Sequence, residues 1–354
     1  MTERADTIRG ALFHAKRTTE EVFGTPNGKP THNTMIERHS HHAQRIADYM
    51  NAVPFVVDPQ ELYTTDKLYA GLDLARPETF SLCYDQQVYN HFLAQGKVTD
   101  NPLEALARNL HDFCIMQSTR RLLAEYDKCK VVAVMGGNAM RRDDASYEKV
   151  ARISKTLTEQ GTLMVSGGGS GAMEATGFGA WMAGRNEADF VEALSRLKAA
   201  PMQEDAGYLQ ASFSIIKDYP QNTYRNLSIP TWLYGHEWTS PFATHIAKLF
   251  ENSVREDTLL TIAYGGIIYA PGRAGTIQEV FQEAVQDHYL TFGFASPMVF
   301  LDTEFWTKTT PFYPLLVDLM EKGIYKNLIL SLTDEPDEVV ETITRFQKNS
   351  LIRV

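Results

Sequence analysis

Glu279 is the residue best placed to do chemistry, because it follows a loop rich in glycine. The loop is Pro271-Gly-Arg-Ala-Gly-Thr276, and the apolar run 267–270 before it is typical of a short buried strand. From residue 276 the apolar residues recur at spacings of three and four, which predicts a helix. A strand, a glycine loop and a helix in this order direct free backbone N–H groups and the positive end of the helix toward one point. Such a point suits an anion.

Glu279 also has a purely structural interpretation. Thr276 is a candidate N-cap of the predicted helix, and a glutamate three residues later is the usual partner in a capping box. On this interpretation Glu279 would have no chemical role. A second glycine loop upstream favours the chemical interpretation.

The second loop, Ser166-Gly-Gly-Gly-Ser-Gly171, lies between a predicted strand at 162–165 and a predicted helix at 172–183. Before it, the apolar run 130–135 predicts a buried strand that ends at Gly136-Gly137. Strands that alternate with helices indicate a parallel sheet, and such sheets bind ligands at the carboxyl ends of their strands. The fold class expected is therefore α/β, a Rossmann-like doubly wound parallel sheet.

The remaining pattern predicts helices and strands along the rest of the chain. These are helices at 35–50, 103–126, 146–161, 189–199, 242–252, 312–320 and 336–346, and strands at 229–234, 297–301 and 328–332. Residues 1–125 contain no glycine-loop motif, so they are predicted to form a mainly helical N-terminal extension. Residues 126–354 are predicted to form the nucleotide-binding catalytic domain.

Two common nucleotide-binding motifs are missing. Glu174 stands where the third glycine of the dinucleotide fingerprint belongs, and no acidic residue ends the next strand, which argues against a tightly bound NAD. No GxxxxGK[ST] sequence occurs, which excludes a P-loop NTPase. A dehydrogenase and a phosphotransferase are both disfavoured.

Composition narrows the function further. The 354 residues carry a net charge of -10, which disfavours binding to a nucleic-acid backbone. No apolar run approaches the ~18 residues of a membrane span, and the N-terminus has no signal pattern, so a cytoplasmic protein is expected. The three cysteines show no metal spacing, and His39, His41 and His42 are interpreted as a solvated or core-edge cluster. No metal is expected.

The two glycine loops together resemble the LOG family, whose members are often labelled "lysine decarboxylase-like". The family pattern pairs GGGxxGxM with PGGxGTxxE, and residues 166–174 and 271–279 match it within a resemblance that covers about 130–345. The resemblance implies a phosphoribohydrolase, which releases the free base and ribose 5-phosphate from a nucleoside 5′-monophosphate. It implies no cofactor and no pyridoxal phosphate lysine, and it suggests a homodimer or higher homo-oligomer.

The resemblance also assigns roles to residues. Glu279 and Arg255 would be catalytic. The substrate would be bound by the two loops and the turn after the first strand, namely by Gly136, Gly137, Gly168, Gly169, Gly171, Met173, Glu174, Gly272, Arg273, Gly275 and Thr276.

Several features depart from the family pattern. Arg273 replaces the second glycine of PGG, and compact members have no counterpart of the first 125 residues, although the larger bacterial nucleotide monophosphate nucleosidases carry such extensions. Arg255 is about one residue from its expected place, and an exposed arginine paired with Glu251 is the alternative. These departures keep a second function open, a nucleotide sensor without turnover. His236-Glu237-Trp238 is either a wall of the base pocket or a structural corner.

Overall fold

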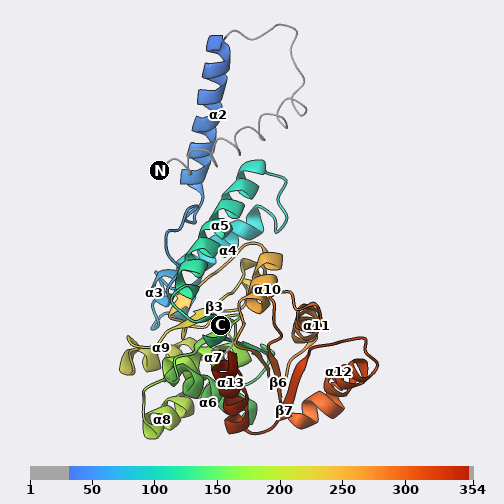
Figure 1. Cartoon of the computed structure of the whole chain (residues 1–354). Coiled ribbons are helices and arrows are strands. Elements are labelled where there is room, and N and C mark those ends of the chain that lie inside the picture. The colour runs from blue at the N-terminus through green and yellow to red at the C-terminus, as the bar shows by residue number, and fades with distance from the viewer. Residues whose placement is uncertain (1–31, 351–354) are drawn as a thin grey trace. The chain divides into compact units, whose positions relative to one another are not determined.

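The computed structural model describes residues 32–350, and the chain divides after Ala52 into two units. The first unit contributes the helix α2 (His32–Ala52), which includes the predicted helix 35–50. His42 on this helix is exposed, and the side chains of His39 and His41 lie outside the described residues. The second unit contains all other elements (Figure 1).

The second unit is built on a seven-stranded sheet in which every pairing is parallel, as the α/β prediction requires. Its order is β4-β3-β2-β1-β5-β6-β7. The strands are β1 (Val131–Met135), β2 (Leu163–Ser166), β3 (Asn226–Ser228), β4 (His245–Ile246), β5 (Ile267–Tyr269), β6 (Pro297–Leu301) and β7 (Ile329–Thr333).

Helices connect most of the strands, with three helices between β2 and β3 and only the short turn η3 (Trp232–Tyr234) between β3 and β4. These helices are α6 (Ala145–Glu159), α7 (Ala172–Trp181), α8 (Glu187–Lys198), α9 (Tyr208–Asp218), α10 (Asn252–Thr261), α11 (Ala274–Tyr289), α12 (Phe312–Glu321) and α13 (Pro336–Ser350), with a further short turn η4 (Phe305–Thr309). Alternate residues of the central strands face one core with α6, α7 and α13. Figure 1 shows α11 and α12 on the other side of β6 and β7 from α13.

The strand order reverses direction between β1 and β5. From β1 the chain proceeds outward through β2, β3 and β4, and it then returns to place β5 beside β1. At such a switch point the connections leave toward opposite faces of the sheet, which opens a crevice at the carboxyl ends of the two strands. Both Gly136-Gly137 and the loop 271–276 start there.

Two predicted elements between residues 229 and 252 are wrong. The strand lies at 226–228 rather than 229–234, because Pro230 follows it and Thr231 caps the turn η3 by accepting from Leu233 N. Residues 242–251 form no helix; they contain β4 and a bridge at Leu249, and helix α10 begins only at Asn252. The apolar residues among them pair with strand β3 and with the N-terminal segment, where Tyr63 and Ile246 exchange two backbone hydrogen bonds of 2.9 Å. Tertiary pairing has overridden a helical pattern.

The N-terminal part of the second unit is helical and contributes no strand to the sheet. Its elements are α3 (Thr65–Leu68), η1 (Pro77–Leu82), α4 (Tyr84–Ala94) and α5 (Pro102–Leu123). Asp85 on α4 reaches the sheet domain, where it forms an ion pair of 2.7 Å with Lys248 and accepts from Trp232 Nε1 at 2.9 Å. These helices therefore support the segments that follow β3 and β4.

Helix α11 carries two buried carboxyl groups that form no ion pair with a Lys, Arg or His among residues 32–350. Glu283 and Asp287 are 4% and 3% exposed. The hydroxyl of Ser296 donates to Glu283 Oε1 at 2.7 Å, and the backbone N–H of Ser296 donates to Asp287 Oδ1 at 3.0 Å. Their other oxygens have no hydrogen-bond partner among the described residues. Burial raises the pKa of Glu283 to about 7 and, together with the charge of Glu283, raises the pKa of Asp287 to about 8.

This pair predicts a pH-dependent stability. Both pKa values are higher in the folded than in the unfolded chain, so the folded state binds more protons and loses stability as the pH rises from about 4 to 8. Relative to wild type, Glu283→Gln/Asp287→Asn should gain unfolding free energy over this interval, by about 1–3 kcal/mol at pH 8. Urea unfolding at several pH values measures this. The exposed control Glu204→Gln should follow wild type, and a double variant that parallels wild type would contradict the account.

Candidate functional site

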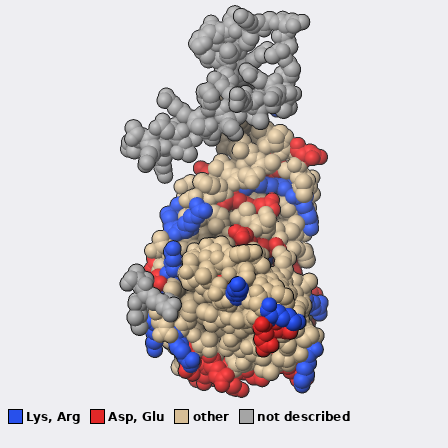
Figure 2. Space-filling view, turned by 45° about the vertical axis from the view of Figure 1, so that its right-hand side comes forward, with Lys and Arg blue, Asp and Glu red and all other residues tan. Residues whose placement is uncertain are grey.

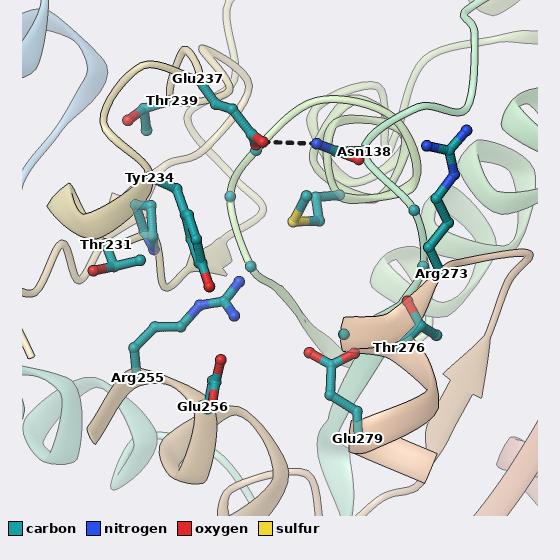
Figure 3. A pocket seen from close by; sticks show the side chains of 18 of the residues that line it. Asn138, Thr231, Tyr234, Glu237, Thr239, Arg255, Glu256, Arg273, Thr276 and Glu279 are labelled. Carbon is teal, nitrogen blue, oxygen red and sulfur yellow. Dashed lines mark hydrogen bonds between the residues drawn. The ribbon is translucent and has the colours of Figure 1, made fainter. Parts of the chain in front are cut away.

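A cavity of about 300 Å³ opens at the switch point (Figure 3). It is formed by the loops after β1, β2 and β5, by the segments after β3 and β4, and by the first turns of α10 and α11. The lining residues are Gly136, Gly137, Asn138, Gly167, Gly168, Gly169, Met173, Pro230, Thr231, Tyr234, Glu237, Trp238, Thr239, Lys248, Arg255, Glu256, Arg273, Gly275, Thr276, Gln278 and Glu279.

The three glycine loops bind one another through their backbones. Gly137 N donates to Pro271 O at 2.9 Å, and Ala172 N donates to Gly137 O at 3.1 Å. Gly171 has φ +66°, and a Cβ at this position would lie 2.3 Å from Gly137 O. An alanine there is excluded by both conformation and space, so Gly171 joins the loops instead of lining the cavity.

The loop after β5 places a threonine and a helix start at the cavity. Helix α11 begins at Ala274, so Thr276 lies in its first turn, and the prediction that Thr276 is the N-cap is wrong. A Cβ on Gly272 would lie 2.2 Å from Thr276 Oγ1, so Gly272 is needed to admit the threonine. The backbone N–H groups of this turn have no partner in the preceding turn of the helix and are available to an anion.

Glu279 lies one turn farther along α11 and lines the cavity. It makes no capping bond, which removes its structural interpretation. In Figure 3 its carboxylate points into the cavity, across from the guanidinium of Arg255. Burial raises the pKa of Glu279 to about 7, while Arg255 lowers it and the charge of Glu256 raises it. A carboxyl group with this pKa changes its charge near neutral pH, which is typical of a catalytic group.

Arg255 comes from α10 and is anchored by the backbone. Its Nε donates to Ile229 O at 3.0 Å, and a Cβ on Gly167 would lie 2.1 Å from its Nη2. The guanidinium therefore rests on the second glycine loop, in space that only a glycine leaves free. Glu251 instead caps α10, so the alternative pairing of Arg255 with Glu251 is absent.

Glu174 has a different place from the one predicted. It is 1% exposed and binds Arg142, itself 1% exposed, through two hydrogen bonds of 2.6 and 2.8 Å. Tyr147 donates to it at 3.0 Å. The carboxylate faces the core between α6 and α7 and does not line the cavity. Met173, its neighbour, does.

The structure thus brings most of the predicted site residues together. Those that line the cavity are Gly136, Gly137, Gly168, Gly169, Met173, Arg255, Arg273, Gly275, Thr276 and Glu279. Gly171, Gly272 and Glu174 do not line the cavity. Arg273 is exposed and lies beside Thr276 (Figure 3).

The wall opposite the loop 271–276 was only partly predicted from the sequence. It contains Tyr234, Thr239 and Lys248 together with Glu237 and Trp238 from the motif 236–238. Glu237 and Trp238 agree with the interpretation of 236–238 as a wall of a pocket. Tyr234, Thr239 and Lys248 lie where the predicted elements were wrong, so no sequence signal placed them at the cavity. His236 is exposed and does not line the cavity.

Three further observations concern metals, membranes and surface charge in the described part of the chain. No cluster of three or more His, Cys, Asp or Glu side chains with metal-binding geometry occurs within residues 32–350. In the same range, no helix has the length and apolar character that crossing a bilayer demands. On the face shown in Figure 2, Lys and Arg occur in separate small groups among Asp and Glu.

Comparisons with known proteins do not show a family for this chain. No family model matches this chain, and no curated protein matches it in sequence. Among solved structures, the chain is similar to the molybdenum cofactor binding protein from the phototrophic bacterium Rippkaea orientalis, with a TM-score of 0.39 and 14% identity. The match covers 61% of this chain and 95% of that protein.

The buried pair of Glu174 and Arg142 predicts a large stability effect. In Glu174→Ala the guanidinium of Arg142 stays buried without its counter-charge, so unfolding free energy should fall by about 3–5 kcal/mol. Urea unfolding measures the loss. Glu341→Ala, which removes the partner of exposed Arg345, should leave the midpoint nearly unchanged. A midpoint for Glu174→Ala equal to that of the control would contradict a structural role.

Proposed function

We propose that this protein hydrolyses the N-glycosidic bond of a nucleoside 5′-monophosphate, giving the free base and ribose 5-phosphate. The observation that carries the proposal is the position of Glu279, one helical turn behind a glycine loop that suits a phosphate and inside the same cavity. One turn is roughly 5 Å, the scale that separates a 5′-phosphate from its ribose. The resemblance to the LOG family supports the proposal through the same residues.

Each part of the cavity has a role in this reaction. The 5′-phosphate accepts from the backbone N–H groups at Gly275 and Thr276, while Arg273 adds positive charge at the rim. Gly168 and Gly169 pass beneath the nucleotide, where a side chain would take the space of the ribose. Arg255 donates charge-assisted hydrogen bonds to oxygens of the substrate.

Glu279 acts on the sugar as the bond breaks. The C1′–N bond cleaves with its electron pair going to the base, and the ribose gains oxocarbenium character. The ionised carboxylate of Glu279 stabilises this positive charge and orients the attacking water, as carboxylates do in glycoside hydrolysis. The water oxygen bonds to C1′, and one of its protons ends on the base nitrogen. No step requires a metal or a cofactor.

The first test removes the charge of Glu279 and keeps its shape. Glu279→Gln should lower base release about 10²–10⁴-fold while still binding the nucleotide. Wild type and variant are incubated with AMP, GMP, IMP, CMP and UMP, and the free base is read by chromatography. Glu321→Gln, an exposed glutamate on α12, should keep wild-type activity. Unchanged hydrolysis in Glu279→Gln would overturn the mechanism, and thermal stabilisation by an intact nucleotide in wild type would indicate a sensor.

The pKa of Glu279 predicts the pH profile of the reaction. Because the ionised form is needed, kcat/KM should rise with pH, with a midpoint of about 7. Glu256 raises that pKa by its charge, so Glu256→Gln should move the midpoint to lower pH. A pH series of initial rates on both proteins measures the shift. A midpoint that is equal in both proteins, or an activity that falls with pH through 7, would contradict this role.

A further inference from the structure

Glu237 lies on the wall opposite the phosphate loop, and no part of the proposed hydrolysis uses it. Its side chain is 22% exposed, and in Figure 3 it extends over the glycine loop toward Asn138. Asn138 Nδ2 donates to its Oε1 at 2.7 Å. Its Oε2 lies 3.3 Å from the position that a Cβ would occupy on Gly169, so a glycine permits this close approach.

The charge of Glu237 is not neutralised by a basic side chain. Among the described residues it has no ion pair with Lys or Arg, and the nearest positive candidate is the exposed His236 at 4.0 Å. Lys248 on the same wall already pairs with Asp85, and both side chains are 1% exposed. Glu237 Oε2 accepts no hydrogen bond from the described residues. The wall therefore offers one oriented carboxylate with free acceptor capacity to whatever occupies the cavity.

Aromatic side chains next to Glu237 provide surfaces on which a flat ring can stack. Tyr234 presents its ring to the cavity in Figure 3, and Trp238 lines the same wall while contacting Phe80 at a ring separation of 5.2 Å. Aromatic side chains provide surfaces on which bases stack. With the phosphate at Thr276 and the ribose at Glu279, the base extends toward this wall.

We propose that Glu237 is the residue that selects the base, and that the base is guanine. This inference rests on the proposed function, whose site it completes. Guanine presents two adjacent N–H donors, at N1 and at the 2-amino group, and a carboxylate accepts from such a pair with both oxygens. Hypoxanthine and uracil present one N–H donor, and adenine and cytosine place a ring acceptor beside their amino group, which a carboxylate repels. Asn138 holds the carboxylate in the required orientation.

The test compares GMP with IMP, which lacks only the 2-amino group. Wild type should favour GMP over IMP in kcat/KM by roughly tenfold or more, because a charged partner left without its donor loses about that factor. Glu237→Gln should reduce this ratio to about one or reverse it, mainly by lowering kcat/KM for GMP. His236→Gln, a control next to it outside the cavity, should keep the wild-type ratio.

Binding separates this inference from the hydrolysis. GMP and IMP are titrated calorimetrically into Glu279→Gln and into Glu279→Gln/Glu237→Gln, so that no turnover is needed. Tighter binding of GMP than of IMP in Glu279→Gln that is lost in Glu279→Gln/Glu237→Gln supports the inference even if no nucleotide is hydrolysed. Hydrolysis with equal use of GMP and IMP, a preference for another base, or a ratio unchanged in Glu237→Gln would overturn the role of Glu237 and leave the hydrolase standing.

Discussion

The site depends on the close approach of three backbone loops at one point of the sheet. Side chains on these loops would keep them apart, and a Cβ on Gly171 would lie 2.3 Å from the carbonyl oxygen of Gly137. Because the loops touch, the start of α11 and the second glycine loop line one small cavity. The same constraint positions Arg255, whose guanidinium occupies the space beside Gly167 that any other residue would fill. The position of Arg255 therefore depends on a glycine at position 167.

The N-terminal helices have a physical role in this arrangement. The segments after β3 and β4 have little regular structure of their own, and they form the wall that holds Tyr234, Glu237 and Lys248. Asp85 from α4 reaches beneath this wall to bind Lys248 and the indole of Trp232. Tyr69 donates to the backbone oxygen of Thr239. One end of the cavity is therefore built by the sheet domain, and the other is stabilised by helices from early in the chain.

The end of the cavity formed by the loop 271–276 could be predicted from the sequence, because its determinants are local. A strand, a glycine loop and a helix lie within a few residues of one another, so Thr276 and Glu279 could be placed beside a glycine loop from the local pattern. Met173 was assigned only through the resemblance to the LOG family. On the opposite wall only the motif 236–238 was considered, as one of two interpretations. Thr239 and Lys248 could not be predicted, since residues 242–250 have helical spacing and are held by pairing with β3 and with Tyr63, far away in the chain. Glu174 was placed wrongly for a related reason. It lies on α7, and the arginine that it binds, Arg142, lies about thirty residues earlier, between β1 and α6. No sequence motif predicts a buried ion pair of this kind.

The most direct measurement is a crystal structure of Glu279→Gln with a bound nucleoside 5′-monophosphate. The account predicts the phosphate on the backbone N–H groups of residues 275–276, C1′ of the ribose beside residue 279, and the base against Tyr234 and Glu237. A nucleotide bound in the reverse direction, or bound outside this cavity, would contradict the claim that the three glycine loops assemble a site for cleaving the N-glycosidic bond.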